Sequence, residues 1–127
     1  MNINDLTLGQ IKEIATMFQK ADGQSIAKDA IGKYVIVRSH NEGVNCGTVV
    51  DADETGIILK DARRLWYYEP EDKKQSWYEG VANSGLGKNS KVSPVVPQKI
   101  IVEDYSITYC TKVGEKSLKD FPQYEQN

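Results

Sequence analysis

The sequence predicts an α+β protein, in which an N-terminal helical segment is followed by an antiparallel, partly barrel-like β-sheet. Apolar residues recur at helical spacing only within about the first 31 residues. From Lys33 onward, short segments rich in β-branched and aromatic residues follow one another at close intervals. Parallel neighbours would need crossovers of about a dozen residues or more, so these strands are expected to pair antiparallel.

The 127 residues are expected to form a single domain. At this length a chain can bury about two thirds of its unfolded surface, so its core needs neither disulfides nor metals. The expected parts are a helical segment (1–31), a β core (32–111) and a polar C-terminal tail (112–127). The tail is either a helical turn or a mobile end.

The helical segment begins at a capping box. Thr7 can cap the first turn, and Gln10, three residues later, can reach back to complete the box. The helix is expected to end near Asp22–Gly23, and a second short helical piece covers Ser25–Ile31 before Gly32. The apolar face of the first helix packs against the sheet or serves subunit contact, and it comprises Leu8, Ile11, Ile14, Ala15 and Phe18.

The β core begins with a predicted meander of strands at 33–39, 45–51 and 55–60. Residues 61–68 are a further strand or the bent continuation of the third. Alternate side chains of a strand point to opposite faces, which separates Arg63 from Arg64. Only one of these arginines can then share a face with Trp66, unless a bulge interrupts the alternation.

The second half of the chain is also predicted to be mostly extended. Residues 76–81 are expected to form another strand, and 83–91 a polar loop that contains G-L-G. Residues 92–97 carry prolines that suit a sheet edge. The long β-patterned run at 98–111 bends or carries a bulge, because neither of its alternating sets is uniformly apolar.

Composition excludes several classes of function. The formal net charge of −2 argues against a DNA-binding or membrane-surface protein, since those carry a basic excess. No apolar stretch approaches the ~20 residues of a membrane span, and the N-terminus does not resemble a signal peptide. Cys46 and Cys110 lack metal-ligand spacing, so reduced, half-buried thiols in a cytoplasmic protein without metal or cofactor are expected.

The residues for catalysis are sparse. His40 is the only histidine, so a Ser-His or Cys-His pair would have to use it. Carboxylate pairs such as Asp51 with Asp53 leave a glycosidase-like alternative open. Arginines beside aromatic rings instead suit an anionic, aromatic ligand such as a nucleotide. The sequence therefore favours a binding protein over an enzyme.

Five blocks, in order, resemble a family of small phage and prophage proteins: G-K-Y-V-I-V-R-S, G-V-N-C-G-T, L-K-D-A-R-R-L-W-Y-Y, K-V-S-P-V-V-P and Y-S-I-T-Y-C-T. The blocks span residues 32–111, and D-A-R-R-L-W is the most specific. The chain resembles the Thoeris anti-defence sponges, which sequester the cyclic ADP-ribose isomers made by bacterial TIR-domain proteins. The resemblance implies a homo-oligomer in the host bacterial cytoplasm, plausibly a hexamer assembled from dimers. It also implies ligands held intact at subunit boundaries, with cyclic oligonucleotides as further ligands.

Candidate ligand residues follow from the chemistry of such a molecule. Arginine makes bidentate, charge-assisted bonds to a diphosphate, and either Arg63 or Arg64 is expected in this role. Stacking on an aromatic ring holds adenine, for which Trp66 or Trp77 is expected. Each assignment has an alternative, since tryptophan in a strand is often core and an arginine can pair with a nearby carboxylate. Polar closure of the site is assigned to Asn83, Asn89, Ser90 and Lys91.

Two other functions remain open. The chain could be a protein-inhibitor module, comparable to an anti-CRISPR protein, that binds a host defence protein through an exposed aromatic face. A single-stranded nucleic-acid binder would use aromatic side chains of a barrel in the same way, but the net negative charge disfavours it.

Overall fold

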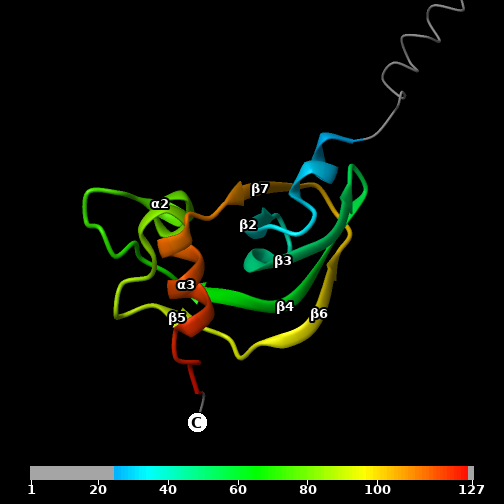
Figure 1. The fold of residues 1–127 in the computed structure, drawn as a ribbon. Coiled ribbons are helices and arrows are strands. Elements are labelled where there is room, and N and C mark those ends of the chain that lie inside the picture. Colours follow the sequence, from blue (N-terminus) through cyan, green and yellow to red (C-terminus); the bar gives the residue numbers. More distant parts are fainter. Residues whose placement is uncertain (1–24, 126–127) are drawn as a thin grey trace, which may run out of the picture.

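The computed structural model describes residues 25–125 as one antiparallel sheet with helices on both faces (Figure 1). The expected helix at 7–22 lies outside these residues. The short helical piece expected at 25–31 is confirmed as a 3-10 helix, with Ser25 as its cap. The elements are η1 (Ile26–Ala30), β2 (Tyr34–Ser39), β3 (Gly43–Asp53), β4 (Gly56–Tyr67), α2 (Trp77–Ser84), β5 (Lys91–Val92), β6 (Val96–Ile101), β7 (Tyr105–Tyr109) and α3 (Lys112–Asp120).

The six strands follow the order β5-β4-β3-β2-β7, with β6 paired to the first part of β4. Every pairing is antiparallel, which confirms the predicted β2–β3–β4 meander. The sheet curves, with β7 and β4 on opposite sides of β2 and β3 in Figure 1, but it is not closed. No helix within residues 25–125 is long and apolar enough to cross a membrane.

Residues 61–67 are the bent continuation of the third strand of the meander, one of the two alternatives that the sequence predicts, and together with 56–60 they form β4. Its register against β3 shifts by one residue between Lys60 and Arg63, and Asp61 at this bulge has φ 52°. Because the bulge adds one residue, side chains after it point to the opposite face from the one that simple alternation predicts. Leu59 and Ala62 therefore both face the core under η1, although they are three residues apart.

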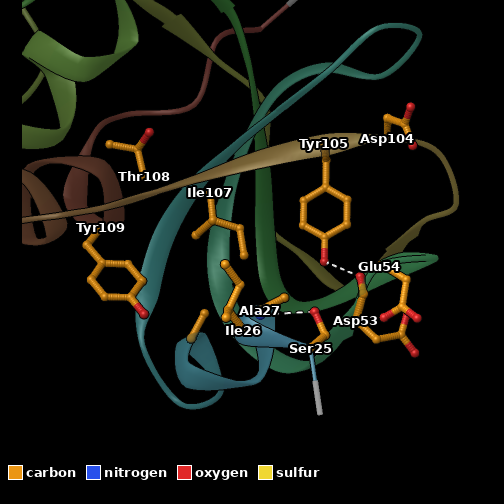
Figure 2. Close-up of a pocket in the computed structure, with 11 residues that line it drawn as sticks. Ser25, Ile26, Ala27, Asp53, Glu54, Asp104, Tyr105, Ile107, Thr108 and Tyr109 are labelled. Atoms are coloured by element: carbon orange, nitrogen blue, oxygen red, sulfur yellow. Dashed lines mark hydrogen bonds between the residues drawn. The ribbon is translucent and has the colours of Figure 1, made fainter. Parts of the chain in front are cut away.

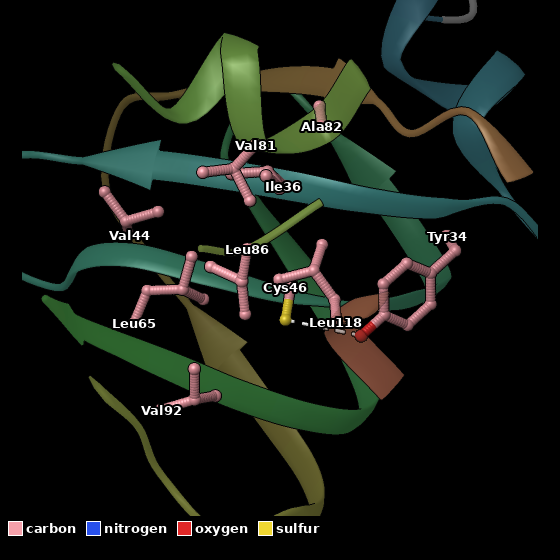
Figure 3. Packing of buried hydrophobic residues seen from close by; sticks show 10 residues of the cluster. All are labelled: Tyr34, Ile36, Val44, Cys46, Leu65, Val81, Ala82, Leu86, Val92 and Leu118. Carbon is pink, nitrogen blue, oxygen red and sulfur yellow. Dashed lines mark hydrogen bonds between the residues drawn. The ribbon is translucent and has the colours of Figure 1, made fainter. Parts of the chain in front are cut away.

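Each face of the sheet has its own buried cluster. One cluster lies beneath α2 and α3 and contains Ile36, Cys46 and Leu118 (Figure 3). There the Tyr34 hydroxyl donates to Cys46 Sγ at 3.3 Å. The other cluster lies beneath η1 and comprises Ala30, Val35, Val37, Val49, Ala52, Ile57, Leu59, Ala62 and Ile101.

The prediction of a strand at 76–81 is wrong, because residues 77–84 form helix α2. Tyr78, Val81 and Ala82 pack against the first cluster, and their spacing of three and four residues is that of a helix. Gly85 follows at φ 95°, a backbone conformation that suits glycine after a helix. The β-prone pair Trp77–Tyr78 misleads a prediction based on local preference.

The polar tail resolves in favour of its helical alternative. Helix α3 is capped by the Thr111 hydroxyl, which accepts the Gly114 N–H at 3.0 Å, and it buries Leu118. Gly114 permits the close approach of α3 to α2, since an added Cβ would lie 2.0 Å from the Ala82 carbonyl oxygen. The long run at 98–111 bends as expected, into β6 and β7.

Candidate functional site

Arg63 is buried, and its guanidinium serves the fold. Nη1 donates to the carbonyl oxygens of Leu118 and Phe121, both at 2.8 Å, and Nε donates to that of Ser93 at 2.9 Å. The last carbonyls of a helix lack partners within the helix and carry partial negative charge, which suits a cation. The donors of Arg63 are thus engaged by backbone carbonyls, which leaves Arg64 as the arginine suited to a phosphate.

Arg64 lies on the other face, as alternation predicts. Its side chain is 42% exposed, and Nη1 lies 4.0 Å from Glu42 Oε1. The same carboxylate oxygen holds Lys99 Nζ at 3.0 Å, and Lys99 also donates to the buried Asn45 side chain. This small group contains two cations and one anion, so an accessible positive charge remains at Arg64.

A second bulge in β4 brings two aromatic residues to one side. Leu65 pairs with Val92 and Tyr67 with Lys91, so Trp66 is the extra residue on β4. Leu65 and Val92 point into the core beneath the helices. Trp66 and Tyr67 remain 43% and 49% exposed. The sequence analysis named a bulge as the condition for both arginines to share a face with Trp66, but this bulge follows Arg63 and Arg64 and leaves them on opposite faces.

Lys91 and Tyr124 complete this surface. Lys91 Nζ lies 5.8 Å from the centre of the Tyr67 ring and 5.5 Å from that of Tyr124. Tyr124 meets Trp66 edge to face, with ring centres 5.6 Å apart, and its backbone N–H donates to the Val92 carbonyl at 2.8 Å. We call Trp66, Tyr67, Lys91 and Tyr124 the aromatic platform. The sequence analysis missed Tyr124, which with Phe121 is one of two aromatic residues in the otherwise polar tail.

The polar loop at 83–91 forms hydrogen bonds with Glu69, a residue of the protein itself. The Glu69 carbonyl oxygen accepts the Gly87 N–H at 2.7 Å, and the Glu69 carboxylate accepts the Asn89 N–H at 3.2 Å. The buried Ser90 hydroxyl accepts the Glu69 N–H, also at 3.2 Å. Glu69 therefore occupies backbone donors that a phosphate would need, and this leaves Lys91 as the loop residue with a clear place in the candidate site.

Trp77 and Asn83 lie on α2, whereas the residues of the aromatic platform come from β4, β5 and the segment after α3. Trp77 is 73% exposed and begins the helix with φ 61°. Asn83 donates its side-chain amide to Gln75 Oε1 at 3.1 Å. Of the two tryptophans proposed for base stacking, the structure places only Trp66 beside Lys91.

A separate groove of about 800 Å³ lies between η1 and β7 (Figure 2). Apolar side chains from both elements point into it, and carboxylates lie at one end. The sequence analysis did not anticipate this groove, because its walls come from three distant segments. Its lining is Ser25, Ile26, Ala27, Ala30, Asp53, Glu54, Asp104, Tyr105, Ile107, Thr108 and Tyr109.

Potential metal ligands and thiols of the described residues are dispersed in the fold. Residues 25–125 contain no group of three His, Cys, Asp or Glu side chains that could hold a metal ion. Both cysteines are free, and burial raises the pKa of Cys46 to about 11 and that of Cys110 to about 12. Thiols with such pKa values stay protonated at neutral pH and are weak nucleophiles.

Comparison with known proteins gives a family for this chain. No curated protein and no solved structure matches it. Residues 32–118, which run from the turn before β2 into α3, match the family model described as a domain of unknown function, DUF6948. The chain belongs to this DUF6948 family.

Proposed function

We propose that the protein binds a cyclic nucleotide signal, a cyclic ADP-ribose isomer, and sequesters it without cleaving it. The observation that carries the proposal is the aromatic platform, where Lys91 Nζ lies within 6 Å of two tyrosine ring centres beside the exposed Trp66. Flat rings next to a cation suit a ligand that combines an aromatic base with phosphates. In this proposal the protein is a phage sponge in the host bacterial cytoplasm.

The chemistry divides between the two halves of the ligand. Adenine stacks on Trp66 or Tyr67, a contact that is worth about 1–3 kcal/mol per base. The diphosphate pairs with Lys91 on β5, and Arg64, two residues before Trp66 on β4, is a further accessible cation. A sponge must bind at about nanomolar level, roughly −12 kcal/mol, which an open platform on one chain does not supply. The proposal therefore includes a homo-oligomer, a hexamer assembled from dimers, that encloses the ligand between subunits.

The test uses ligand recovery and paired tryptophan variants. The full chain is incubated with a cyclic ADP-ribose isomer, desalted and heated, and the released small molecules are identified by mass spectrometry. Intact ligand is the expected result, whereas a linear product would show an enzyme. Trp66→Ala should weaken binding by about 5- to 150-fold, the equivalent of one lost stack. Trp77→Ala makes the same change outside the aromatic platform and should leave affinity unchanged.

A second function has its own supporting observation. Helices α2 and α3 expose two apolar side chains, Trp77 and Val113, on the layer that covers the sheet. Exposed aromatic residues are common anchors in protein interfaces. A protein-inhibitor module that binds a host defence protein would use this layer. In that case Trp77→Ala abolishes the inhibitory effect and Trp66→Ala does not, the reverse of the result expected for a sponge.

A further inference from the structure

Strand β7 forms an open edge of the sheet. The strand order ends at β7, and β2 is the only strand within residues 25–125 that pairs with it. Cys110 donates its N–H to the Tyr34 carbonyl at 3.3 Å, one step beyond the pair Val35↔Tyr109. In an antiparallel pair, hydrogen-bonded and non-hydrogen-bonded residues alternate. The backbone N–H and C=O groups of Tyr105, Ile107 and Tyr109 therefore point away from β2, toward the open side.

This edge lacks the features by which edge strands avoid pairing. Proline, lysine and bulges all discourage the addition of another strand. Strand β6, the edge beside β4, carries Pro97 and Lys99. Strand β7 reads Y-S-I-T-Y and contains no charge, no proline and no register shift against β2. The edges within residues 25–125 are thus built differently: β5, at the other end of the strand order, is two residues long and carries Lys91, and β7 is the edge suited to accept a partner.

We propose that β7 pairs antiparallel with β7 of a second copy of this chain, around a two-fold axis at Ile107. The segment Y-S-I-T-Y has nearly the same residue types in both directions, so the axis places Tyr105 of one copy opposite Tyr109 of the other. The outward groups of these residues supply about six hydrogen bonds between the copies. The sheet then continues from one copy into the next, as in other strand-addition interfaces.

The groove beside β7 fits this partner. Tyr105, Ile107 and Tyr109 line the groove with Ile26, which is 90% exposed (Figure 2). An added β7 strand carries the same three side chains on the same face, and they would extend over the groove and cover Ile26. Burial of this apolar surface adds a hydrophobic contribution to the backbone pairing.

Charge complementarity also favours a second copy over an unrelated peptide. Lys33 Nζ lies 5.7 Å from the centre of the Tyr109 ring, at one end of β7. Glu54 and Asp104 line the groove near the other end, around Tyr105. The two-fold axis turns one copy end to end, so it brings Lys33 of each copy toward the carboxylates of the other. Two such contacts form in every dimer.

The test measures the mass of the full chain by light scattering over a range of concentrations. Twice the mass of one chain is expected for the wild type, or a higher even multiple where such dimers assemble further. Lys33→Glu places like charges together and should raise the dimer dissociation constant by about tenfold or more. The double variant Lys33→Glu with Glu54→Lys exchanges the two charges and should restore dimerisation. Lys73→Glu, the same change in the exposed β4–α2 loop, should have no effect.

A backbone variant provides an independent measurement. Ile107→Pro removes an outward N–H and leaves the hydrogen bonds to β2 intact, so it should yield monomers. In the wild type, hydrogen exchange of the 105–109 amides should slow as concentration rises. A chain that is monomeric at all concentrations, or dimers unaffected by both Lys33→Glu and Ile107→Pro, would overturn the pairing. The variants leave the aromatic platform untouched, so this proposal and the nucleotide proposal can fail separately.

Discussion

The Arg63 guanidinium donates to the carbonyl oxygen of Leu118 at 2.8 Å, across 55 positions of sequence. The contact joins the buried side of β4 to the last turn of α3. It explains why one member of the adjacent arginine pair is withdrawn from solvent while Arg64 remains accessible. A structural cation and a candidate binding cation therefore occupy consecutive positions, and substitution separates their effects.

Arg63→Ala is expected to destabilise the protein. Hydrogen bonds to charged groups are worth about 1.5–3 kcal/mol, and the substitution leaves several carbonyls at the end of α3 without their donor. The free energy of unfolding, measured in urea, should fall by about 2–4 kcal/mol. Arg64→Ala is the matched control, and its effect on stability should stay within about 0.5 kcal/mol. Equal stability of the two variants would contradict the structural role of Arg63.

The protein is expected to lose stability in acid, because the pKa of Glu103 is lowered in the folded state. Its carboxylate accepts the Asn41 side-chain and backbone N–H groups at 2.7 and 2.8 Å, and it thereby ties the β6–β7 corner to the β2–β3 turn. The Ser39 hydroxyl and these donors lower the pKa of Glu103 from 4.5 to about 2. Ser39 Oγ has no partner in hydrogen-bonding geometry within residues 25–125, so the Asn41 contacts are the better-defined cause.

The direction of the effect follows from proton linkage. Because the folded-state pKa lies below the unfolded one, Glu103 stabilises the fold above about pH 4.5, and this contribution is lost as the pH falls toward 2. Urea unfolding at several pH values between 2 and 6 measures it. Glu103→Gln should flatten the dependence in that range, whereas Glu71→Gln, at an exposed loop carboxylate, should retain it. An unchanged pH profile for Glu103→Gln would count against this contact.

Gly114→Ala tests the contact between the two helices. The added Cβ would lie 2.0 Å from the Ala82 carbonyl oxygen, so α2 and α3 would have to separate. Overpacking of this kind costs about 1–3 kcal/mol, and a clash with backbone should reach the upper end. Thermal unfolding measures the loss, and Lys112→Ala on the exposed side of α3 is the control. A stability equal to that of the wild type would show that the helices do not pack this closely.

Local patterns predicted the parts of the fold that depend on neighbours in sequence. Short connections gave the β2–β3–β4 meander, and alternation separated Arg63 from Arg64. The bulge at Trp66 depends on how β4 meets β5, a pairing across more than twenty residues that alternation alone does not contain. Helix α2 was missed because its first residues favour strands, while burial of Val81 and Ala82 beneath the sheet decides for a helix.

In the candidate site, too, residue type suggests some members, while others depend on contacts between distant parts of the chain. Residue type alone suggests Trp66 for base stacking and Lys91 for polar closure, whatever the fold, and both assignments stay predictions. Tyr124 was missed because its backbone contact to Val92 forms only after α3 returns the chain to the sheet. The loop donors near Asn89 were available in sequence, and Glu69 takes them in the folded protein.

Trp66 should report directly on ligand binding. Trp77→Phe leaves Trp66 as the single tryptophan, because the chain contains two. If a base stacks on the aromatic platform, titration with a cyclic ADP-ribose isomer should quench the remaining fluorescence in a saturable way. In this background Lys91→Gln should weaken the ligand by about tenfold, since it removes the charge between the Tyr67 and Tyr124 rings. Lys88→Gln, three residues earlier in the exposed loop, is the matched control. Quenching that is equally sensitive to both lysines would point to general electrostatic attraction and would remove the platform from the proposal.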